Sequence, residues 1–451
     1  MRIAGLVSPL RTFLVASVLG ACAQARQDGV DPSTLGIGES GDYGDDDGNG
    51  DGNGSGSGNG GDGSDGGEKL DIGTMQDGDG CGEGGSSGGI PAAEFSYIWI
   101  ANSAQGTVSK VDTREGVELA RYRTSTTPGN PSRTSVNLYG DVAVMNREGS
   151  SVARIAARAA DCRGPSTSTG PDDIKPFGAD DCMLWSQPLG ASGAYEDGPR
   201  PVAWEGGTDA CDSNPRLWVG WTDTAAAITY VKRLDGATGT TLDEVEIPGW
   251  TFGIAPIGAY GGAANKAGDF WVVGLAGPLV RIDGASLAVE IIPRRPDSYF
   301  YGIALDQHGN PWMGDLSGVS WTYDVPSATL RKNPAAGARG RGIMVDRYGR
   351  AWMPVHTNPD PTPGLCSLAE IDTVTGAVVT NHPLPDCVEP VGVAVDVDDY
   401  VWVVDKGANR AYKFDPELRE IVLTVDTLDG PYTYSDMTGS GLDLVVNPPT
   451  G

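Results

Sequence analysis

The chain has 451 residues, with 60 acidic and 32 basic side chains and a formal net charge of −28. This charge excludes nucleic acid and anionic membrane surfaces as expected partners, because phosphate binding needs a cationic surface. The 67 glycines are unevenly distributed, and the stretch that is richest in them cannot bury a hydrophobic core.

The N-terminus has the features of a signal peptide over residues 1–21. Arg2 and Arg11 precede the apolar run TFLVASVLGA, which is too short to span a bilayer. The run ends in Leu-Gly-Ala before Cys22, which resembles the lipobox of bacterial lipoproteins, where the cysteine receives diacylglycerol. We therefore expect export and a membrane anchor through lipid on Cys22, with an ordinary signal peptide and a chance cysteine as the alternative. Because Ala23 follows, we expect the cell envelope of a Gram-negative bacterium, at its outer membrane.

Residues 22–91 form a predicted tether of Gly, Asp, Asn and Ser, as in GDDDGNGDGNGSGSGNGGDGSDGG. Such a chain behaves as a flexible coil that its like charges extend. The aspartates invite comparison with a calcium loop, but the late bidentate glutamate and rigid flanks of such a loop are missing. The tether is thus expected to hold the folded part clear of the membrane.

From residue 92 to 451 one phrase recurs: small and apolar residues, an aspartate, a short turn and then a tryptophan or another apolar residue. The copies centre on Trp99, Val144, Trp218, Trp271, Trp312, Trp352 and Trp402. The last three, in GIALDQHGNPWMG, GIMVDRYGRAWMP and GVAVDVDDYVWVV, lie 40 and 50 residues apart, which fits one four-stranded blade per copy. The pattern predicts an all-β, seven-bladed β-propeller whose tryptophans pack between blades. Six or eight blades are the alternatives, because an insertion at 159–211 blurs the count.

Closure of the ring is also predicted. The first copy, at 97–102, lacks a preceding strand, while 434–446 is an extra strand after the seventh copy. Pairing the two would complete the first blade and remove an open sheet edge.

The cysteines suit disulfides in an oxidising compartment, because six remain of the seven once Cys22 is set aside. Cys366 and Cys387 bracket one predicted hairpin and are expected to pair. The pairing of the other four stays open: Cys81, Cys162, Cys182 and Cys211.

The repeats, together with Arg-Ile-Asp-like strands such as VRID at 280–283, resemble the streptogramin B lyase (virginiamycin B lyase) group of propellers and NHL-type repeats over about residues 95–446. The resemblance implies blades of that type and, for the lyases, a magnesium-assisted ring opening that uses an inner-strand histidine and glutamates after the tryptophan strand. The corresponding inner-strand positions here are Asp436, Arg133, Arg200, Phe252, Tyr301, Arg341 and Val391. The positions after the tryptophan strands are Asn102, Asn146, Trp221, Gly274, Asp315, His356 and Asp405. Since neither set supplies the lyase residues, the resemblance extends to the blades and stops at catalysis.

Arginines at the predicted starts of inner strands suggest a cup for an anionic or glycan-like ligand. Guanidinium groups give planar, bidentate contacts to carboxylate or phosphate, and aromatic faces stack on sugars or cations. Aromatic residues are expected beside these arginines, at Trp250, Phe252, Tyr299, Phe300, Tyr301, Tyr432 and Tyr434. The candidate ligand-binding residues are Arg133, Arg200, Arg341, Tyr301, Phe252, Asp436 and His356. The alternative is that each arginine pairs with an acid such as Asp436, Glu389 or Asp315 and joins blades together.

Two functions remain open. The leading one is a monomeric, non-enzymatic surface module that binds a ligand or partner without a cofactor. The other is a metal-assisted lyase or hydrolase, in which Asn102, Asp315 and Asp405 would hold a divalent ion such as magnesium or calcium, as in lactonase-like propellers.

Overall fold

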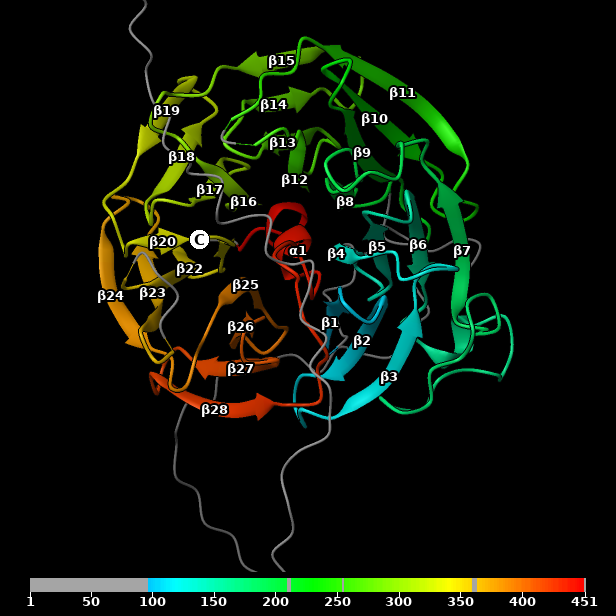
Figure 1. The fold of residues 1–451 in the computed structure, drawn as a ribbon. Coiled ribbons are helices and arrows are strands. Elements are labelled where there is room, and N and C mark those ends of the chain that lie inside the picture. The colour runs from blue at the N-terminus through cyan, green and yellow to red at the C-terminus, as the bar shows by residue number, and fades with distance from the viewer. Residues whose placement is uncertain (1–95, 209–211, 254, 359–362, 450–451) are drawn as a thin grey trace, which may run out of the picture. The chain divides into compact units, whose positions relative to one another are not determined.

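The computed structural model describes residues 96–208, 212–253, 255–358 and 363–449. The predicted signal peptide, Cys22, the tether 22–91, Cys81 and Cys211 lie outside the described residues. Figure 1 shows the described strands arranged as blades in a ring. The strands form seven antiparallel sheets, so the predicted seven-bladed β-propeller is confirmed.

The blades follow one another along the chain, and each is written here from its innermost strand outward. Blade 1 contains β1 (Tyr97–Asn102), β2 (Thr107–Asp112) and β3 (Glu118–Arg123). Blade 2 contains β4 (Pro131–Val136), β5 (Val142–Asn146), β6 (Ser151–Ile155) and β7 (Met183–Pro188), with the short 3₁₀ helix η1 (Ala159–Asp161) between the last two. Blade 3 contains β8 (Val202–Trp204), β9 (Leu217–Asp223), β10 (Ile228–Leu234) and β11 (Thr241–Pro248). The stretch 159–211 thus holds β7 and β8 as well as loops.

The remaining blades complete the ring. Blade 4 contains β12 (Ala259–Ala264), β13 (Phe270–Gly274), β14 (Leu279–Ile282) and β15 (Val289–Ile292). Blade 5 contains β16 (Phe300–Leu305), β17 (Pro311–Asp315), β18 (Ser320–Asp324) and β19 (Thr329–Lys332). Blade 6 contains β20 (Arg339–Gly340), β21 (Met344–Val345), β22 (Arg350–His356), β23 (Cys366–Asp372) and β24 (Val378–Pro383), and its first two strands both pair with the third. Blade 7 contains β25 (Pro390–Val395), β26 (Val401–Asp405), β27 (Arg410–Asp415) and β28 (Glu420–Val425).

The recurring phrase encodes a tryptophan–aspartate hydrogen bond in blades 5 to 7. In blade 7, Trp402 Nε1 donates to Asp396 Oδ2 over 2.8 Å, and the other carboxylate oxygen of Asp396 accepts from two backbone N–H groups of the following turn. The same pairing joins Trp352 to Asp346 over 2.9 Å. Each of these buried carboxylates is therefore satisfied by its own blade, and the tryptophans are packed out of contact with solvent as predicted.

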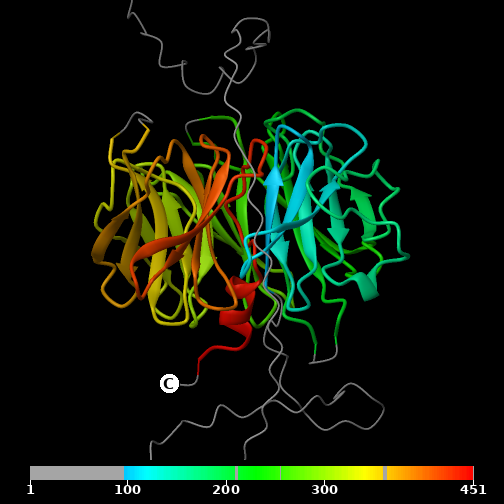
Figure 2. The same ribbon diagram turned by 90° about the horizontal axis from the view of Figure 1, so that it is seen from below.

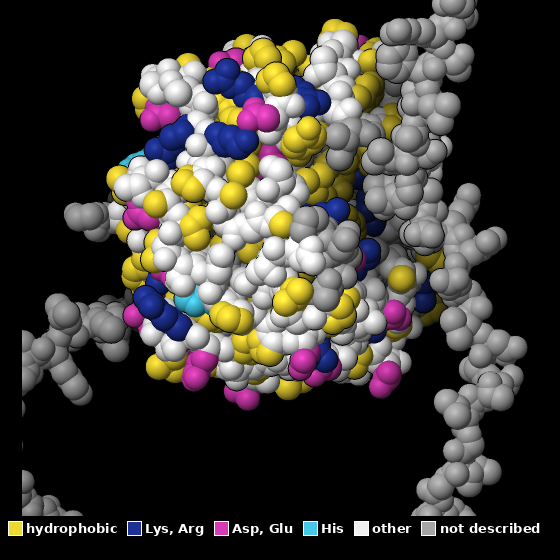
Figure 3. All heavy atoms as spheres, turned by 60° about the vertical axis from the view of Figure 1, so that its left-hand side comes forward, with side chains coloured by type: hydrophobic (Ala, Val, Ile, Leu, Met, Phe, Trp, Pro, Cys, Tyr) yellow, Lys and Arg dark blue, Asp and Glu magenta, His cyan; other side chains and the backbone are white. Residues whose placement is uncertain are grey.

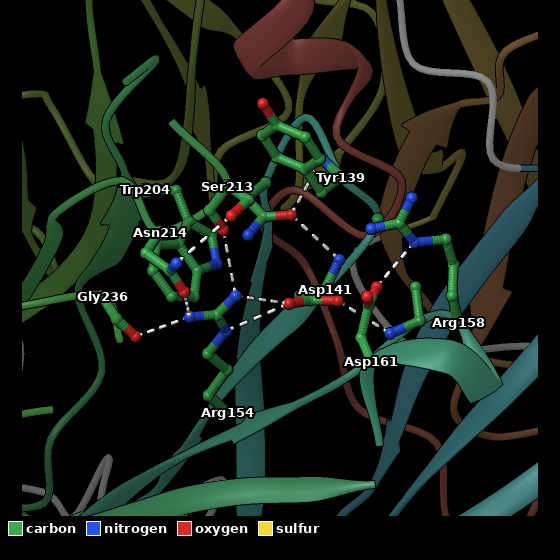
Figure 4. A network of polar contacts seen from close by, with 12 residues as sticks. Tyr139, Asp141, Arg154, Arg158, Asp161, Trp204, Ser213, Asn214 and Gly236 are labelled. Atoms are coloured by element: carbon green, nitrogen blue, oxygen red, sulfur yellow. Dashed lines mark hydrogen bonds and ion pairs between the residues drawn. The ribbon is translucent and has the colours of Figure 1, made fainter. Parts of the chain in front are cut away.

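In blades 2 and 4 an arginine instead holds an aspartate at the other end of this turn, just before the second strand, at Asp141 and Asp269. In blade 2, Arg154 forms an ion pair of 2.6 Å with Asp141 and also donates to the carbonyl of Gly236, over 2.6 Å, in blade 3 (Figure 4). Both side chains are buried, so breaking this pair leaves an uncompensated charge that costs about 3–5 kcal/mol. The aspartate–arginine pair therefore joins neighbouring blades as well as fixing a turn.

The predicted closing strand at 434–446 is only partly right. Residues 431–437 lie beside β1, where Trp99 N–H donates to the carbonyl of Met437 over 2.9 Å and Tyr432 N–H donates to that of Ala101 over 2.8 Å. Ala101 N–H in turn donates to Thr433 Oγ1 over 2.7 Å. This closing segment, 431–437, completes blade 1 at the seam of the ring, through scattered bonds instead of a regular ladder.

The end of the predicted strand is instead a helix, α1 (Ser440–Val446). Gly439 before it has a φ of 87°, and Asp436 Oδ1 accepts the N–H of Gly439 over 2.8 Å, so the chain turns away from the strand direction. Figure 1 shows α1 at the centre of the ring, and Figure 2 shows it at one end of the propeller. Its apolar side chains are buried there against inner strands, which explains why an alternating Leu-Asp-Leu-Val pattern is helical here.

The predicted disulfide between Cys366 and Cys387 is present, and a second joins Cys162 to Cys182. Both connect the ends of loops or hairpins close in sequence, as is common in extracellular or periplasmic proteins. Among the described helices, none has the length and apolarity needed to cross a membrane.

We predict that Thr433→Val weakens ring closure, because the fully buried N–H of Ala101 loses its acceptor while side-chain volume is nearly kept. The expected loss is about 1–3 kcal/mol of unfolding free energy, measured by urea denaturation followed by tryptophan fluorescence. Thr424→Val, at an exposed position of β28, is the matched control and should leave the transition unchanged. Equal midpoints for the two variants would contradict the role given to this bond.

Candidate functional site

Backbone irregularities at the start of the inner strands turn side chains toward the propeller axis. In β12 the pairing shifts between Ala259 and Gly261, so Tyr260 is an extra, unpaired residue. Tyr301 is the extra residue of the same shift in β16. Bulges of this kind change the direction in which a side chain points. In blade 6 the inner strand is interrupted between β20 and β21, and Arg341 lies at this interruption.

These positions, with neighbours from other elements, form a compact group that we call the arginine–tyrosine cluster. Its members are Arg133, Arg147, Arg200, Arg341, Tyr260, Tyr301, Tyr432 and Tyr434. Two of the predicted arginines, Arg133 and Arg341, are thereby brought together around Tyr301, which Arg133 Cζ approaches to 6.0 Å and Arg341 Cζ to 5.8 Å. The third, Arg200, is joined to them through Tyr260, at 5.5 Å.

Arg133 lies at the centre of the cluster. Its guanidinium carbon is 3.1 Å from the ring centroid of Tyr434 and 4.7 Å from that of Tyr260. Nη1 donates to the carbonyl of Tyr434 over 3.1 Å, and Nη2 donates to that of Tyr301 over 3.4 Å. Burial lowers the pKa of Arg133, against the opposing influence of the tyrosines. Cation–π contacts of about 0.5–2 kcal/mol each hold the charge where water does not reach it.

The cluster has more positive charge than negative. Arg341 forms an ion pair of 2.6 Å with Glu389. Within the described residues, no carboxylate lies within ion-pair distance of Arg133, Arg147 or Arg200, although each is at most 2% exposed. The alternative that every arginine pairs with an acid therefore holds for Arg341 alone.

Several polar atoms of this region lack partners. Among the described buried side chains, those without a hydrogen-bond partner include Nε of Arg133, Arg200 and Arg341, Oη of Tyr434 and both ring nitrogens of His356. Native proteins leave few buried polar groups unsatisfied, and each one calls for an explanation such as a bound ion or water.

His356 ends β22 and is 1% exposed. Burial, followed by the charges of Arg341 and Arg339, lowers its pKa to about 4. The imidazole is therefore neutral at neutral pH, with one ring nitrogen able to donate and the other able to accept a hydrogen bond.

Two predicted ligand-binding residues lie elsewhere. Phe252 is not in an inner strand, because blade 4 begins with β12 seven residues later, and it packs against the core of that blade. Asp436 belongs to the closing segment but turns toward α1, where its carboxylate accepts from the N–H groups of Thr438 and Gly439. Burial, against these hydrogen bonds, raises the pKa of Asp436 to about 6.

The three candidate metal ligands do not fit a magnesium or calcium ion. Asp405 receives four backbone N–H groups of its own blade, including those of Val388 and Glu389. Asp315 accepts from Tyr299 N–H and Trp321 Nε1, and Asn102 Oδ1 accepts from Asp429 N–H. All three are fully buried, and their oxygens are already occupied by these hydrogen bonds. No group of three or more metal-ligating side chains was found in the described part of the chain.

Sequence reasoning missed three members of this region: Arg147, Tyr260 and Tyr195. A signal for Tyr260 exists, because Tyr-Gly-Gly-Ala-Ala at 260–264 has the pattern of Tyr-Gly-Ile-Ala-Leu at 301–305. Arg147 follows β5 and contacts Tyr195 at 5.1 Å, a pairing that depends on how a long loop folds back. No local sequence pattern predicts this contact.

No protein family and no curated protein matches this chain. Among solved structures, a functionally unknown protein from Desulfotomaculum acetoxidans is similar, with 10% identity, a TM-score of 0.53, and coverage of 75% of this chain and 98% of that one. Virginiamycin B lyase from Staphylococcus aureus has 15% identity and a TM-score of 0.47, covering 66% of this chain and 85% of its own. AztD from Citrobacter koseri has 13% identity and a TM-score of 0.47, covering 75% and 96%. The neighbours include the group that the repeats resemble, and at these identities the similarity concerns the fold alone.

We predict that His356 makes the protein less stable in mild acid. Since its pKa falls from 6.5 to about 4 on folding, the unfolded chain takes up a proton in this pH window that the folded chain does not. Stability should fall as the pH drops from 6.5 to 4, by about 3 kcal/mol from this residue. Urea denaturation across this range should show a smaller loss for His356→Gln than for the wild type, whereas His308→Gln, in an exposed turn, should keep the wild-type slope. Parallel curves for the wild type and His356→Gln would contradict the assignment.

Proposed function

We propose that this chain is an exported, lipid-anchored β-propeller that binds an anionic ligand at the arginine–tyrosine cluster and acts as a non-enzymatic binding module. The observation that carries the proposal is the excess of buried guanidinium groups. Three of the four have no carboxylate partner in the described structure, in a chain whose net charge is −28. A buried charge is costly unless it is paired, so a bound anion would offset this cost.

The unpartnered atoms support the same conclusion. Each of Arg133, Arg200 and Arg341 has a buried Nε–H that donates to nothing in the described structure. Carboxylate, sulfate and phosphate oxygens are suitable acceptors, and bonds between ionised partners are about twice as strong as neutral ones. The imidazole of His356 adds one further hydrogen-bond donor. Because the ring is neutral, it neither repels a cation nor attracts a second anion.

The cluster reaches solvent at one edge. Tyr432 is partly exposed, Tyr195 is 37% exposed, and exposed Lys406 lies with its Nζ 5.5 Å from the ring of Tyr432. These residues belong to the end of the ring where inner strands begin, whereas α1 lies with the turn aspartates Asp346 and Asp396 at the other end. A ligand would therefore enter past Tyr195 and Tyr432.

The outside of the blades differs from the axis. Figure 3 shows basic and acidic side chains interspersed over the side of the ring that carries β19, β24 and β28. Many of these are paired across the surface, such as Lys332 with Asp297 at 2.7 Å. Such exposed pairs contribute about 0–1 kcal/mol and leave no local excess of charge. The concentration of unpaired cations thus favours the axis as the ligand site.

We predict that sulfate and citrate raise the melting temperature of the wild-type protein when ionic strength is held constant with chloride, because a ligand that binds the native state stabilises it. Arg341→Gln should weaken this binding about tenfold or more, since a charge-assisted hydrogen bond contributes about 1.5–3 kcal/mol. In this variant Glu389 keeps Lys406 as an ion-pair partner, at 3.1 Å. Arg331→Ala, exposed on β19, is the control and should bind as the wild type does. A wild type that neither anion stabilises, or equal weakening by both substitutions, would refute the proposal; a sulfated glycan tested alongside distinguishes a small anion from a glycan ligand.

The anchor is tested separately. We predict that Cys22→Ala moves the protein from the membrane fraction to the soluble fraction of the cell envelope, because the variant has no thiol to which a lipid can be attached. Fractionation followed by immunoblotting measures this change, with Cys81→Ala as a cysteine control that leaves the lipobox and the two disulfides of the propeller intact. Membrane association that survives Cys22→Ala would contradict a lipid anchor at this position.

A further inference from the structure

Tyr432 occupies a special place in the arginine–tyrosine cluster. It lies on the closing segment and its hydroxyl makes a short hydrogen bond with that of Tyr301. The hydroxyl of Tyr260 is 3.3 Å away on β12. Three phenol groups from three elements therefore meet at one point, and a hydroxyl that accepts from two others is stabilised when it carries negative charge.

Cations surround this meeting point. Arg147, which follows β5, has its guanidinium carbon 5.0 Å from the ring centroid of Tyr432, and Lys406, which follows β26, has its Nζ at 5.5 Å. Arg341 contacts the ring of Tyr301 from the blade 6 interruption. The carboxylate that faces them is Glu389, which Arg341 and Lys406 already share.

We propose that the hydroxyl of Tyr432 is the acid–base group of the cluster: without a ligand it releases its proton to solvent, becomes a phenolate between Arg147 and Arg341, and recovers a proton when an anionic ligand binds. The phenolate supplies, from the chain itself, the negative charge that the buried arginines lack. The protonation of Tyr432 on anion binding rests on the proposed function, whereas its ionisation in the ligand-free protein does not.

The surrounding charges select Tyr432 among the four tyrosines. Burial raises the pKa of Tyr260, Tyr301 and Tyr434 above the ordinary value of 10.0. Burial acts in the same direction on Tyr432, but Arg147, followed by Arg341 and the hydrogen bond with Tyr260, outweighs the opposing influences and the pKa of Tyr432 is lowered. Tyr195, which accepts a hydrogen bond from Arg147 Nη1 over 3.2 Å, raises the pKa of Tyr432 more than Arg341 lowers it, and the net lowering therefore depends first on Arg147. A single proton leaves this group first, and its loss raises the cost of ionising the other three.

Ligand binding and proton uptake are linked by this arrangement. An anion that enters beside Arg147 and Arg341 would meet the phenolate as a like charge, so the phenolate is protonated as the anion binds. At a pH where Tyr432 is ionised, each tenfold rise in proton activity should therefore raise the anion affinity about tenfold. Sulfate is a suitable probe, because its own charge is constant over this range.

The first experiment is a spectrophotometric titration of the exported, ligand-free protein, in which tyrosine ionisation is followed near 295 nm while circular dichroism confirms that the fold is kept. The chain has 15 tyrosines, and we expect one equivalent to ionise ahead of the others and below pH 10.0. Tyr432→Phe should remove this early step. Tyr348→Phe, at a position that is 62% exposed and outside the cluster, should keep it.

A second variant guards against misfolding of the first. Arg147→Gln keeps all tyrosines and should shift the early step to higher pH, because the phenolate loses a neighbouring cation. Early ionisation that persists unchanged in both Tyr432→Phe and Arg147→Gln overturns the assignment, as does its absence from the wild type.

The second experiment measures sulfate affinity of the wild type by calorimetry, from one pH unit below to two pH units above the early ionisation step found in the titration. The sulfate affinity of the wild type should fall about tenfold per pH unit above the early ionisation step. The sulfate affinity of Tyr432→Phe should not show this fall, because the variant has no hydroxyl to ionise at this position. A flat wild-type profile overturns the proton-linked half of the proposal. If sulfate does not bind at all, the proposed function fails, while the titration still decides whether Tyr432 is the ionising group.

Discussion

The hydrogen bonds of a buried aspartate in the turn between the first two strands are the constraint on which blades 2, 4, 5, 6 and 7 depend. A buried carboxylate is unfavourable unless it is satisfied, and backbone N–H groups supply donors while a tryptophan or an arginine supplies one more. Asp396 with Trp402, and Asp141 with Arg154, show the two versions of this arrangement. Because these bonds fix the end of the inner strand, the start of the same strand is left to vary. The bulges and the interruption that point Tyr260, Tyr301 and Arg341 at the axis all occur at this start.

The propeller was predictable because the repeat is a local pattern with a fixed period. Aspartate, turn and tryptophan are close in sequence, so their bond leaves a signature that does not depend on the rest of the molecule. The pairing of Cys366 with Cys387 was predictable for the same reason, since both flank one hairpin. The helix α1 was not, because its Leu-Asp-Leu-Val alternation reads as a strand. The helix forms because its apolar side chains are buried at the centre of the ring, and that environment exists only in the assembled propeller.

The site was predictable in its arginines but not in its chemistry. Position within the repeat was enough to place Arg133 and Arg341 near the axis. Which side chains contact these arginines depends on five or more elements. Within the described residues, Arg133 contacts tyrosine rings and not a carboxylate. The choice of Phe252 failed because Phe-Gly-Ile-Ala at 252–255 has the same pattern as Tyr-Gly-Ile-Ala at 301–304, whereas the inner strand β12 begins only at Ala259 and is rich in glycine and alanine. Blade repeats therefore reveal which residues approach the axis, while partners and burial emerge only from the assembled ring.

The closing segment has a consequence for the order of events in the cell. It supplies Tyr432 and Tyr434, so residues near the C-terminal end complete the seam of blade 1 and the arginine–tyrosine cluster together. A chain interrupted between residues 405 and 431 would carry all seven copies of the repeat and yet lack half of the cluster's tyrosines. Until Tyr432 and Tyr434 are in place, the arginines of the cluster would stay hydrated in the unclosed propeller. If the cluster binds an anion as proposed, binding would require the final segment to dock, and partly synthesised or clipped chains would not bind.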